Sequence, residues 1–383
     1  MRRNQECELP DVIIIGGGIA GCATAWYLAA DGVDVLLLEQ DHLNASASGA
    51  NAGSLHAQIQ HEPFVELGEA WAKSFAPALP FFAASIALWK SAGAEIGADL
   101  GVVQCGGILV AKSEDEMRLI EAKSRIETAA GLEMELLNRA DLQARAPYVA
   151  RDMIGGVYCP VEGKADPLTA APAFAAAAES RGAVIRRGCR VELLRRCDAG
   201  YEVVTSEATF TAPRVVNAAG VETGRVAAMV GVSLPIQAFP IQLSVTEPAV
   251  ALVDHLVYAA RDMLTLKQTS IGTILIGGGW PAAIDDLGRP QVSPESLSRN
   301  LAVALDVVPA LANINIVRTW AAIVNGTTEW RPILGEVPGA PGFYINYVPW
   351  MGFTGGPGGA RVVASLVQGK PPPLDIDVSY FSP

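Results

Sequence analysis

The apolar positions in the first forty residues form two short runs on either side of an Ala-rich segment. Residues 11–15 are rich in β-branched side chains, as a buried parallel strand is, and residues 33–39 form a second apolar run. Between them, residues 19–30 are rich in alanine and predict a helix, with Gly32 as its expected end. The pattern predicts a β-α-β unit at the start of the chain.

Farther along, strand-like and helical patterns alternate without a repeat of fixed period. Helices are predicted at residues 63–97, 114–130, 169–180, 294–305 and 360–368. Strands are predicted at residues 102–111, 155–160, 183–187, 190–194, 201–205, 208–210, 214–217, 241–246, 263–267, 273–277, 314–323 and 343–347. The strands at 214–217 and 343–347 lead into small-residue turns at 218–220 and 351–359, as the first strand does. This repetition predicts a discontinuous domain that the chain enters three times.

The composition excludes several classes of protein. Hydrophobic residues make up 50% of the chain and charged residues 18%, which is enough apolar material to rule out global disorder. The formal net charge of −12 argues against a nucleic-acid partner, because phosphates require Lys and Arg. No window of 18 uninterrupted apolar residues is present, and residues 12–15 are too short for a signal-peptide core. We therefore expect no membrane span and a cytoplasmic location, with peripheral attachment to the inner face of the membrane left open.

The cysteines and histidines predict neither a disulfide framework nor a metal site. The six cysteines contain no CxxC pair, and the four histidines show no HxxxH spacing. We interpret the cysteines as reduced thiols. They are Cys7, Cys22, Cys105, Cys159, Cys189 and Cys197.

The motif Gly16-x-Gly18-x-x-Gly21 follows the first predicted strand and opens the predicted helix. Gly16 permits a tight turn, Gly18 lets a pyrophosphate approach the backbone, and Gly21 lets helix and strand pack closely. The helix N-terminus offers free N–H groups to phosphates. Glu39, 18 residues after Gly21, ends the second strand, where its carboxylate can accept both ribose hydroxyls. The motif predicts a dinucleotide site without choosing between NAD and FAD.

A run of small and hydroxylated residues at 44–56 follows Glu39 and favours close backbone contact with a second part of the ligand. With this run, the chain resembles the D-amino-acid-oxidase superfamily of FAD-dependent amine oxidoreductases. Further stretches resemble that family in the same order: GCRVELL around Val191, VVNAAGVETGRVAAMVG at 215–231 and GFTGGPGGARVVASLVQGK at 352–370. The resemblance implies that FAD is the cofactor. The residues it implies as FAD contacts are Gly16, Gly18, Ile19, Ala20, Gly21, Glu39, Gln40, Ser46, Ser48, Gly49, Asn51, Ala52, Gly53, Ser54, Val191, Ala219, Gly220, Gly352, Phe353, Thr354, Gly355 and Gly356.

The resemblance also implies the architecture. We expect an α/β fold with a Rossmann-like FAD-binding domain and an antiparallel-sheet substrate domain, both discontinuous in sequence. Residues 1–88, 150–232 and 325–383 are expected to form the FAD-binding domain. Residues 89–149 and 233–324 are expected to form the substrate-binding domain.

Three stretches resemble the smaller, FAD-carrying subunit of bacterial opine oxidases and dehydrogenases: residues 48–60, 263–280 and 319–338. Opines are secondary amines flanked by carboxylates. The resemblance implies oxidation of such an amine at the C–N bond to an imine, which water splits into an amino acid and a 2-keto acid. It also implies a hetero-oligomer, in which partner subunits carry a further flavin or an iron–sulfur cluster.

One departure from the superfamily pattern concerns the substrate carboxylate. Simpler members carry an Arg-Pro pair before a Pro-x-x-Gly segment, and that arginine binds the carboxylate. Here Val324-Asn325 stand in that place, ahead of Pro332. Lys267 and Arg331 are the nearest candidate replacements. The missing arginine argues against glycine or D-amino-acid oxidase activity.

Five residues are candidates for the substrate side: His56, Lys267, Gln268, Glu329 and Trp330. Lys267 and Gln268 end a predicted strand, where they are either carboxylate contacts or solvated strand-end residues. Lys267 is also a candidate cation near the flavin of an oxidase. His56 follows the expected flavin loop, as a pocket residue or as a satisfied loop histidine. Glu329 and Trp330 are candidates for the pocket wall, although a buried tryptophan more often belongs to a core.

Three other functions stay open at this point. The first is a D-amino-acid, proline or hydroxyproline dehydrogenase or oxidase of the same fold. The second is a non-catalytic flavin subunit that relays electrons. The third is an NAD-dependent Rossmann dehydrogenase, which leaves the small-residue stretches at 44–56 and 352–359 without a purpose.

Overall fold

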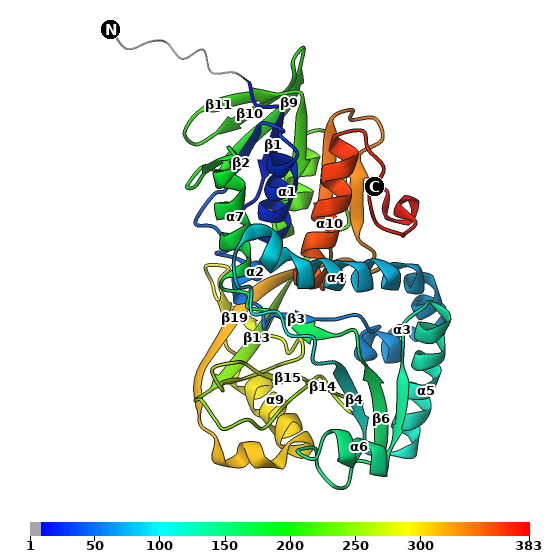
Figure 1. Ribbon diagram of the computed structural model, residues 1–383. Helices are drawn as coiled ribbons and strands as arrows, with labels where there is room; N and C mark the ends of the chain where they lie inside the picture. Colours follow the sequence, from blue (N-terminus) through cyan, green and yellow to red (C-terminus); the bar gives the residue numbers. More distant parts are fainter. Residues whose placement is uncertain (1–8) are drawn as a thin grey trace.

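The computed structural model describes residues 9–383. Residues 1–8, which include Cys7 and the start of the expected FAD-binding domain, lie outside the described residues. The described chain forms an upper part around β1 and α1 and a lower part around β13, β4 and β6 (Figure 1). Each part has its own central sheet, and α4 lies between them. The α/β fold with two discontinuous parts, expected from the sequence, is confirmed.

The upper sheet has six strands in the order β20-β21-β12-β1-β2-β8. All neighbours run parallel except β20, which is antiparallel to β21. The strands are β1 (Val12–Ile15), β2 (Val35–Leu38), β8 (Val184–Arg186), β12 (Arg214–Asn217), β20 (Ile333–Glu336) and β21 (Phe343–Tyr347). Strands from the start, the middle and the end of the chain thus share one sheet, as the repeated strand-then-glycine pattern predicts.

Both faces of the upper sheet are covered, which explains why its strands are continuous apolar runs. Val12 and Ile14 pack against helices, while Ile13 and Ile15 pack against a small sheet. The covering elements are α1 (Ile19–Ala30), α7 (Ala170–Ser180) and α10 (Gly352–Val367) on one face and β9 (Val191–Cys197), β10 (Gly200–Thr205) and β11 (Thr209–Ala212) on the other.

The lower sheet has eight strands in the order β19-β13-β16-β15-β14-β4-β6-β5, antiparallel except where β14 meets β4. The strands are β4 (Gly107–Ala111), β5 (Glu135–Asn138), β6 (Gly155–Cys159), β13 (Gln237–Thr246), β14 (Leu256–Ala259), β15 (Thr265–Gln268), β16 (Ile274–Gly277) and β19 (Ile316–Gly326). Its helices are α5 (Glu114–Ala129), α6 (Arg139–Arg145) and α9 (Pro294–Val307). The remaining short elements are α2 (Ala47–Ala50), β3 (Ser54–Leu55), β7 (Gly163–Lys164), α8 (Thr223–Ala228), β17 (Ala283–Ile284) and β18 (Pro290–Gln291).

The helical stretch His61–Ile96 comprises α3 (His61–Phe75) and α4 (Leu79–Ile96). Its length and hydropathy alone would suit a membrane span, but 50% of the apolar window is buried inside the fold. Gly68, with a φ of +78°, kinks α3. In α4 the buried residues include Phe81 and Trp89. The stretch therefore has the features of core helices, in which apolar residues pack against other parts of the protein.

Two details differ from the sequence-based expectation. The glycine-rich segment 351–359, expected as a turn before a helix at 360, is itself helical from Gly352. Glycine has a low helix propensity, but here packing overrides it: a Cβ at Gly356 would lie 2.8 Å from Ile19, and one at Gly358 would lie 2.7 Å from Ser85. The close approach of α10 to α1 and α4 thus requires the glycines.

The second difference concerns β6. We expected residues 150–232 in the FAD-binding domain, but β6 pairs with β4 and β5 in the eight-stranded sheet. Its neighbours in sequence give no sign of this, because pairing partners are set by the whole fold. We propose that the boundary lies after β6, and the rest of the division stays a prediction.

Candidate active site

The three glycine-containing bends meet at the carboxyl ends of β1, β12 and β21. Parallel pairing sets Ile15 beside Asn217, so Gly16 lies against the bend after β12. An added Cβ at Gly16 would lie 2.4 Å from the Ala218 carbonyl oxygen. The start of α10 joins them, because Gly356 packs on Ile19. Segments that lie far apart in sequence, at residues 16–21, 218–220 and 352–356, thus form one site.

The first bend has the geometry of a phosphate-binding turn. Gly16 has a φ of +112°, which favours glycine. A Cβ at Gly21 would lie 1.9 Å from the Gly16 carbonyl oxygen, so only glycine lets α1 begin so close to β1. Gly18 is the N-cap of α1 and has no side-chain capping bond of its own. Instead, Ser48 Oγ accepts a hydrogen bond of 3.0 Å from the Ile19 N–H. A polar oxygen thus already sits at a helix N-terminus, the place where phosphate oxygens bind.

Glu39 directly follows β2 and faces the glycine turn. Its Oε2 accepts a 2.6 Å hydrogen bond from the Gly17 N–H, and its Oε1 accepts a 2.8 Å bond from the Asp41 N–H. Val191 is buried on the neighbouring β9, and Gln40 is exposed. Glu39 therefore stands beside the turn, as a ribose-binding carboxylate requires.

The loop after Glu39 folds back under the turn. Asn51 fixes it, because its Oδ1 accepts from the Gly53 N–H at 2.6 Å and its Nδ2 donates to the Ser48 carbonyl at 2.6 Å. Gly53 has a φ of +73°, and a Cβ there would lie 2.2 Å from the Ala165 carbonyl oxygen. Small residues therefore line this loop for a steric reason, in addition to any contact with a ligand.

The second and third bends complete the cradle. Gly220 has a φ of +58° and lies near the Asn325 amide. Thr354 in α10 accepts from the His56 N–H at 2.9 Å and donates to the Ser54 carbonyl. A Cβ at Gly352 would meet nothing within 4 Å, so the first residue of α10 borders open space. The polar groups and the space at the three bends fit a dinucleotide cofactor.

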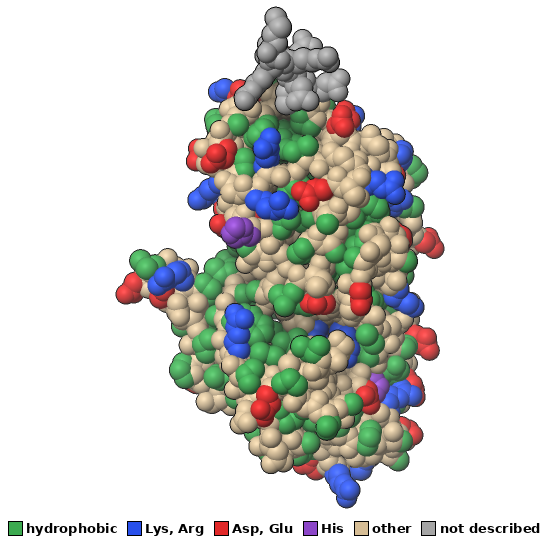
Figure 2. Space-filling view, turned by 60° about the vertical axis from the view of Figure 1, so that its left-hand side comes forward, with side chains coloured by type: hydrophobic (Ala, Val, Ile, Leu, Met, Phe, Trp, Pro, Cys, Tyr) green, Lys and Arg blue, Asp and Glu red, His purple; other side chains and the backbone are tan. Residues whose placement is uncertain are grey.

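A cavity of about 660 Å³ opens beside this cradle. In the space-filling view, hydrophobic side chains gather around a hollow between the upper and lower parts (Figure 2). Asn51, Ala52, Ser54, Phe353 and Thr354 all line the cavity, so the expected flavin contacts and the cavity share one wall. The cofactor's reactive end is thus expected to face this space.

Tryptophans form another wall. The rings of Trp330 and Trp350 stack, with centroids 4.8 Å apart, and Phe239 packs on Trp350 at 4.4 Å. Both tryptophans have positive φ, +64° and +57°, an uncommon and costly conformation for a bulky residue. Gly326 makes room for Trp350, since a Cβ there would lie 2.3 Å from the indole. The two tryptophans with strained backbone conformations thus both belong to the cavity wall.

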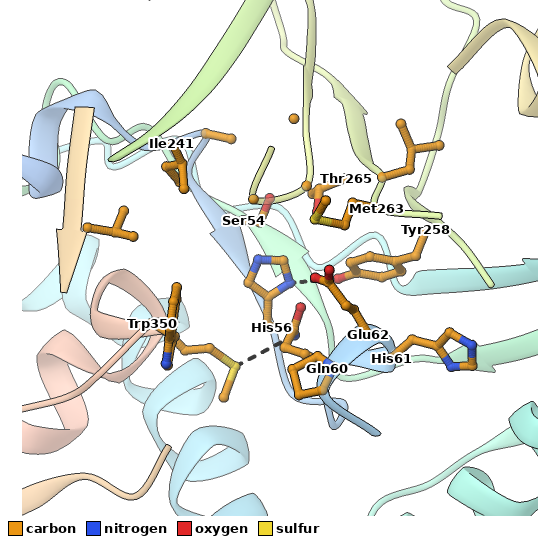
Figure 3. Close-up of a pocket in the computed structure, with 18 of the residues that line it drawn as sticks. Ser54, His56, Gln60, His61, Glu62, Ile241, Tyr258, Met263, Thr265 and Trp350 are labelled. Carbon is orange, nitrogen blue, oxygen red and sulfur yellow. Dashed lines mark hydrogen bonds between the residues drawn. The ribbon is translucent and has the colours of Figure 1, made fainter. Parts of the chain in front are cut away.

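His56 lies in the middle of the cavity, with Trp350 on one side and Tyr258 on the other (Figure 3). Its Nδ1 lies 2.8 Å from the Tyr258 hydroxyl. Burial, followed by the charge of Lys267, lowers the pKa of His56 to about 3, so the imidazole is neutral at physiological pH. Of the five substrate-side candidates, the structure brings His56 and Trp330 to the cavity.

The other three candidates lie elsewhere. Glu329 is exposed, with 74% of its side chain accessible. The Gln268 side-chain oxygen accepts from the N–H groups of Leu252 and Val253, and the two protons of its NH₂ group are shared among the carbonyls of residues 249, 250 and 272. Its polar atoms hold the 249–253 loop, so we propose a structural role for Gln268 in place of the expected catalytic one. Arg331 donates to the Tyr380 carbonyl at 2.8 Å, away from the cavity, and does not replace the missing arginine.

Lys267 is 2% exposed and lies just behind the flavin loop. A Cβ at Gly53 would lie 3.2 Å from its Nζ, which has no hydrogen-bond partner among residues 9–383. Burial, with the charge of Lys164 next, holds the pKa of Lys267 well below its ordinary value. The buried amine is therefore a destabilising group, retained at the edge of the site, and not a solvated strand end.

We expect Lys267→Met to stabilise the protein at pH 7 by on the order of 1–3 kcal/mol, since an unpaired buried polar group is removed. The unfolded lysine binds a proton below pH about 10.4, while the folded one does so only at much lower pH. Wild-type stability must therefore rise with pH across this window, and the advantage of the variant must shrink. Denaturant titrations at pH 7 and 9.5 measure this, with the exposed Lys73→Met as control. A less stable variant would contradict the assignment.

Several residues at the cavity carry no motif in the sequence. They are Tyr258, Arg261, Lys123 and Trp350 on the lining, with Glu162 behind Tyr258. Tyr258 and Glu162 lie about 100 residues apart in sequence and meet only through strand pairing. The Gly106-Gly107 pair is the one local signal that a close approach occurs there.

Within residues 9–383, no three His, Cys, Asp or Glu side chains come together as a metal site. The five described cysteines are free thiols, and none of them pairs with another.

Comparison with known proteins gives consistent matches. The family described as FAD dependent oxidoreductase (DAO) matches residues 11–366. An opine oxidase subunit of Rhizobium meliloti is 30% identical, over 97% of this chain and 96% of its own. The corresponding opine oxidase subunit of Agrobacterium tumefaciens is 28% identical, over 88% and 87%. The crystal structure of glycine oxidase from Geobacillus kaustophilus matches with a TM-score of 0.84 at 27% identity, covering 97% of this chain and 98% of that one.

Proposed function

Because this chain belongs to the DAO family of FAD-dependent oxidoreductases and is an FAD-dependent amine oxidoreductase, we propose that its substrate is an opine-like secondary amine. The C–N bond of the amine is oxidised to an imine, and water splits the imine into an amino acid and a 2-keto acid. The three glycine bends, the third of which is the start of α10, would hold the FAD together with Ser48 and Glu39. When bound, FAD supplies the acceptor for the two electrons that leave the carbon beside nitrogen.

The observation that carries the substrate assignment is the wall formed by β19. Val324 lines the cavity where simpler relatives of the superfamily are expected to place an arginine. A β19 wall without a cation disfavours a small amino acid held by its carboxylate alone, and suits a secondary amine with a larger N-substituent.

Among the described residues, the cavity lining contains two cations, Lys123 and Arg261. Lys123 is buried, and its Nζ pairs with Glu127 at 2.6 Å, so its charge is already compensated. Arg261 is mostly exposed at the cavity mouth, and its nearest partner is Asp306 at 3.6 Å. Arg261 is thus the group available to a substrate carboxylate, while the aromatic wall of Trp330 and Trp350 excludes water from the amine.

Partner subunits are part of the proposal. The relatives with 30% and 28% identity are themselves named as single subunits of an opine oxidase. The described cysteines do not cluster, so an iron–sulfur centre that takes electrons onward belongs to a partner. Cytoplasmic location and partner identity stay predictions. Co-expression with the adjacent reading frames and gel filtration test for a stable complex.

The substrate assignment is tested by steady-state kinetics of the holoenzyme with an artificial electron acceptor. N-(1-carboxyethyl) amino acids are compared with glycine, D-alanine and L-proline, and the released 2-keto acid is quantified. We expect the secondary amines to have the highest kcat/KM, with one 2-keto acid formed per two electrons. Higher kcat/KM with glycine or proline would favour the ordinary amino-acid oxidases of this fold.

Arg261→Gln is expected to raise KM for a dicarboxylate secondary amine about threefold to fivefold, with little change in kcat, because an exposed charge contributes at most about 1 kcal/mol. The effect must diminish at high salt, where the charge is screened. Initial rates over a range of substrate concentrations measure this. Arg299→Gln, a similarly exposed arginine outside the main cavity, is the control. An equal KM in both variants would remove Arg261 from the substrate site.

A further inference from the structure

A buried chain of polar side chains runs from the cavity toward α5. It begins at His56 Nδ1, which lies 2.8 Å from the Tyr258 hydroxyl. Tyr258 donates a 2.9 Å hydrogen bond to Glu162 Oε2. Gln58 continues the chain from Glu162 to Lys123. Neither the dinucleotide cradle nor the proposed carboxylate contact uses this chain.

Glu162, in the loop between β6 and β7, is fully buried and is surrounded by donors. Its Oε1 accepts from the N–H groups of Ala57 and Gln58, at 2.7 and 2.9 Å. Its Oε2 accepts from Gln58 Nε2 at 3.0 Å and from Tyr258. Room for it exists only because residue 107 is glycine, since a Cβ there would lie 1.7 Å from Oε2. The fold thus contains a closely fitted carboxylate site next to the cavity.

The direction of these hydrogen bonds follows from what each group can donate. The Lys123 ammonium is donor only, so the Gln58 carbonyl faces Lys123 and the Gln58 NH₂ faces Glu162. Three of the four partners of Glu162 are therefore fixed donors. Burial raises the pKa of Glu162, but a proton on this carboxyl would find only the Tyr258 oxygen as acceptor. The donor set favours the ionised carboxylate.

An ionised Glu162 sets the tautomer of His56. Tyr258 has one hydroxyl proton and gives it to Glu162, so the Tyr258 oxygen accepts from His56. Burial raises the pKa of Tyr258, which keeps that proton in place. The His56 proton then sits on Nδ1, and Nε2 carries a lone pair. His56 Nε2 has no hydrogen-bond partner in the part of the chain that the structure describes, and the ring lies in the cavity (Figure 3).

We propose that His56 Nε2 accepts a hydrogen bond from the N–H of the substrate amine, and that Tyr258 and Glu162 are positioning residues that hold this acceptor tautomer. The inference rests on the proposed function, because it needs an amine in the cavity. A neutral secondary amine has one N–H and one lone pair. Engaging the N–H fixes the direction of the lone pair, which must align with the carbon that is oxidised.

Titratable and charged groups from several elements surround His56. They are Lys267 on β15, Tyr258 on β14, Glu162 in the β6–β7 loop, Glu62 on α3 and, at the cavity mouth, Arg261 after β14. Because the pKa of His56 is lowered to about 3, Nε2 stays an acceptor across the range from about pH 5 to 9. The opposite tautomer, with a proton on Nε2, would make His56 a donor suited to a carboxylate.

The tautomer is measured on the holoenzyme by nitrogen NMR with ¹⁵N-histidine labelling, which is tractable because the chain has four histidines. His56→Asn assigns the signals. We expect a protonated Nδ1 and an unprotonated Nε2 in the wild type, and a mixture of tautomers in Tyr258→Phe. Tyr148→Phe is the matched control, since it removes a tyrosine hydroxyl 2.8 Å from another histidine, His255. A wild-type signal from a protonated Nε2 would overturn the inference, whatever the substrate is.

The hydrogen bond itself is tested with two unreactive analogues whose α-carbons are fully substituted, one with N–H and one with N–CH₃. We expect the methylated analogue to bind about tenfold more weakly to the wild type, in line with one lost hydrogen bond. In His56→Phe this difference must vanish, and in His56→Gln, whose amide oxygen accepts, it must partly return. An equal difference in all three proteins overturns the hydrogen bond. If neither analogue binds, the proposed substrate class and the hydrogen bond are both contradicted. The tautomer measurement is independent of this result and still stands.

Discussion

Gly21→Ala is expected to yield protein that lacks flavin. The new Cβ would lie 1.9 Å from the Gly16 carbonyl oxygen, which belongs to the backbone of the turn and cannot move aside alone. Either α1 shifts away from β1 or the turn opens, and in both cases the N–H groups of the helix start leave their positions. Overpacking of this kind costs about 1–3 kcal/mol or more, so cofactor affinity is expected to fall at least about tenfold. The flavin absorbance per protein, measured after gel filtration, reports the loss.

The control for this variant is the same substitution in another helix. Gly224 in α8 has its nearest neighbour 3.8 Å from an added Cβ, so Gly224→Ala removes a helix glycine without a collision. That variant is expected to keep its flavin and to gain slightly in stability, because alanine has the higher helix propensity. Full flavin content in Gly21→Ala would show that the first bend does not hold the cofactor.

Gly107→Ala is expected to be the second most damaging change, although Gly107 itself does not line the cavity. Its Cβ would lie 1.7 Å from Glu162 Oε2. A carboxylate at the end of a side chain ordinarily moves aside at little cost, but this one satisfies two backbone N–H groups, Gln58 and Tyr258. Moving it leaves buried donors without partners, which costs about 1–3 kcal/mol each. Denaturant unfolding is expected to show a loss on the order of 3 kcal/mol.

The comparison for this variant is Gly277→Ala in β16, where an added Cβ meets only the Leu243 side chain, at 3.2 Å. We expect a small effect there, since a leucine side chain can adjust. The histidine NMR spectrum separates the two consequences of Gly107→Ala, because a displaced Glu162 also releases the tautomer of His56. A Gly107→Ala protein with wild-type stability and an unchanged His56 signal would contradict the role given to Glu162.

The sequence predicts the backbone geometry of the first glycine turn well because that geometry is local. A tight turn, a close backbone approach and a helix start each require glycine at a fixed spacing. The spacing of Gly16, Gly18 and Gly21 therefore predicts the turn and the start of the helix without knowledge of the rest of the fold. The helix at Ile19–Ala30 and the strands at Arg214–Asn217 and Phe343–Tyr347 have the predicted bounds, because a buried element with clear glycine punctuation leaves little choice.

The substrate side is predicted poorly because its residues are set by pairings that the sequence does not display. In the sequence, Gln268 is a strand-end amide free to meet a substrate. In the fold, most of its hydrogen bonds go to residues 249–253, which lie near it only after the sheet assembles. From the sequence, Lys267 could equally well be exposed to solvent at the end of a strand. In the fold, Lys267 on β15 is buried. Tyr258 and Glu162 have no motif at all. The contact of Tyr258 with His56 spans 202 residues of chain, and its contact with Glu162 spans 96.

The glycine-rich start of α10 shows that a clear local signal in the sequence can also predict the wrong secondary structure. By propensity alone, GFTGGPGG is a turn, and the sequence predicts it as one. The glycines instead let a helix approach Ile19, Ser85 and Val348 more closely than any side chain permits. The low helix propensity of this segment thus accompanies tight helix packing, which brings the N-terminus of α10 next to the start of α1.

The most direct test of the account is the absorption spectrum of the purified holoenzyme before and after anaerobic mixing with an N-(1-carboxyethyl) amino acid. The account predicts an oxidised-flavin band that bleaches in a single turnover, with one 2-keto acid released per flavin. A yellow protein whose band persists with every secondary amine offered, yet bleaches with glycine or proline, would contradict the assigned substrate, and a colourless preparation would contradict the cradle itself.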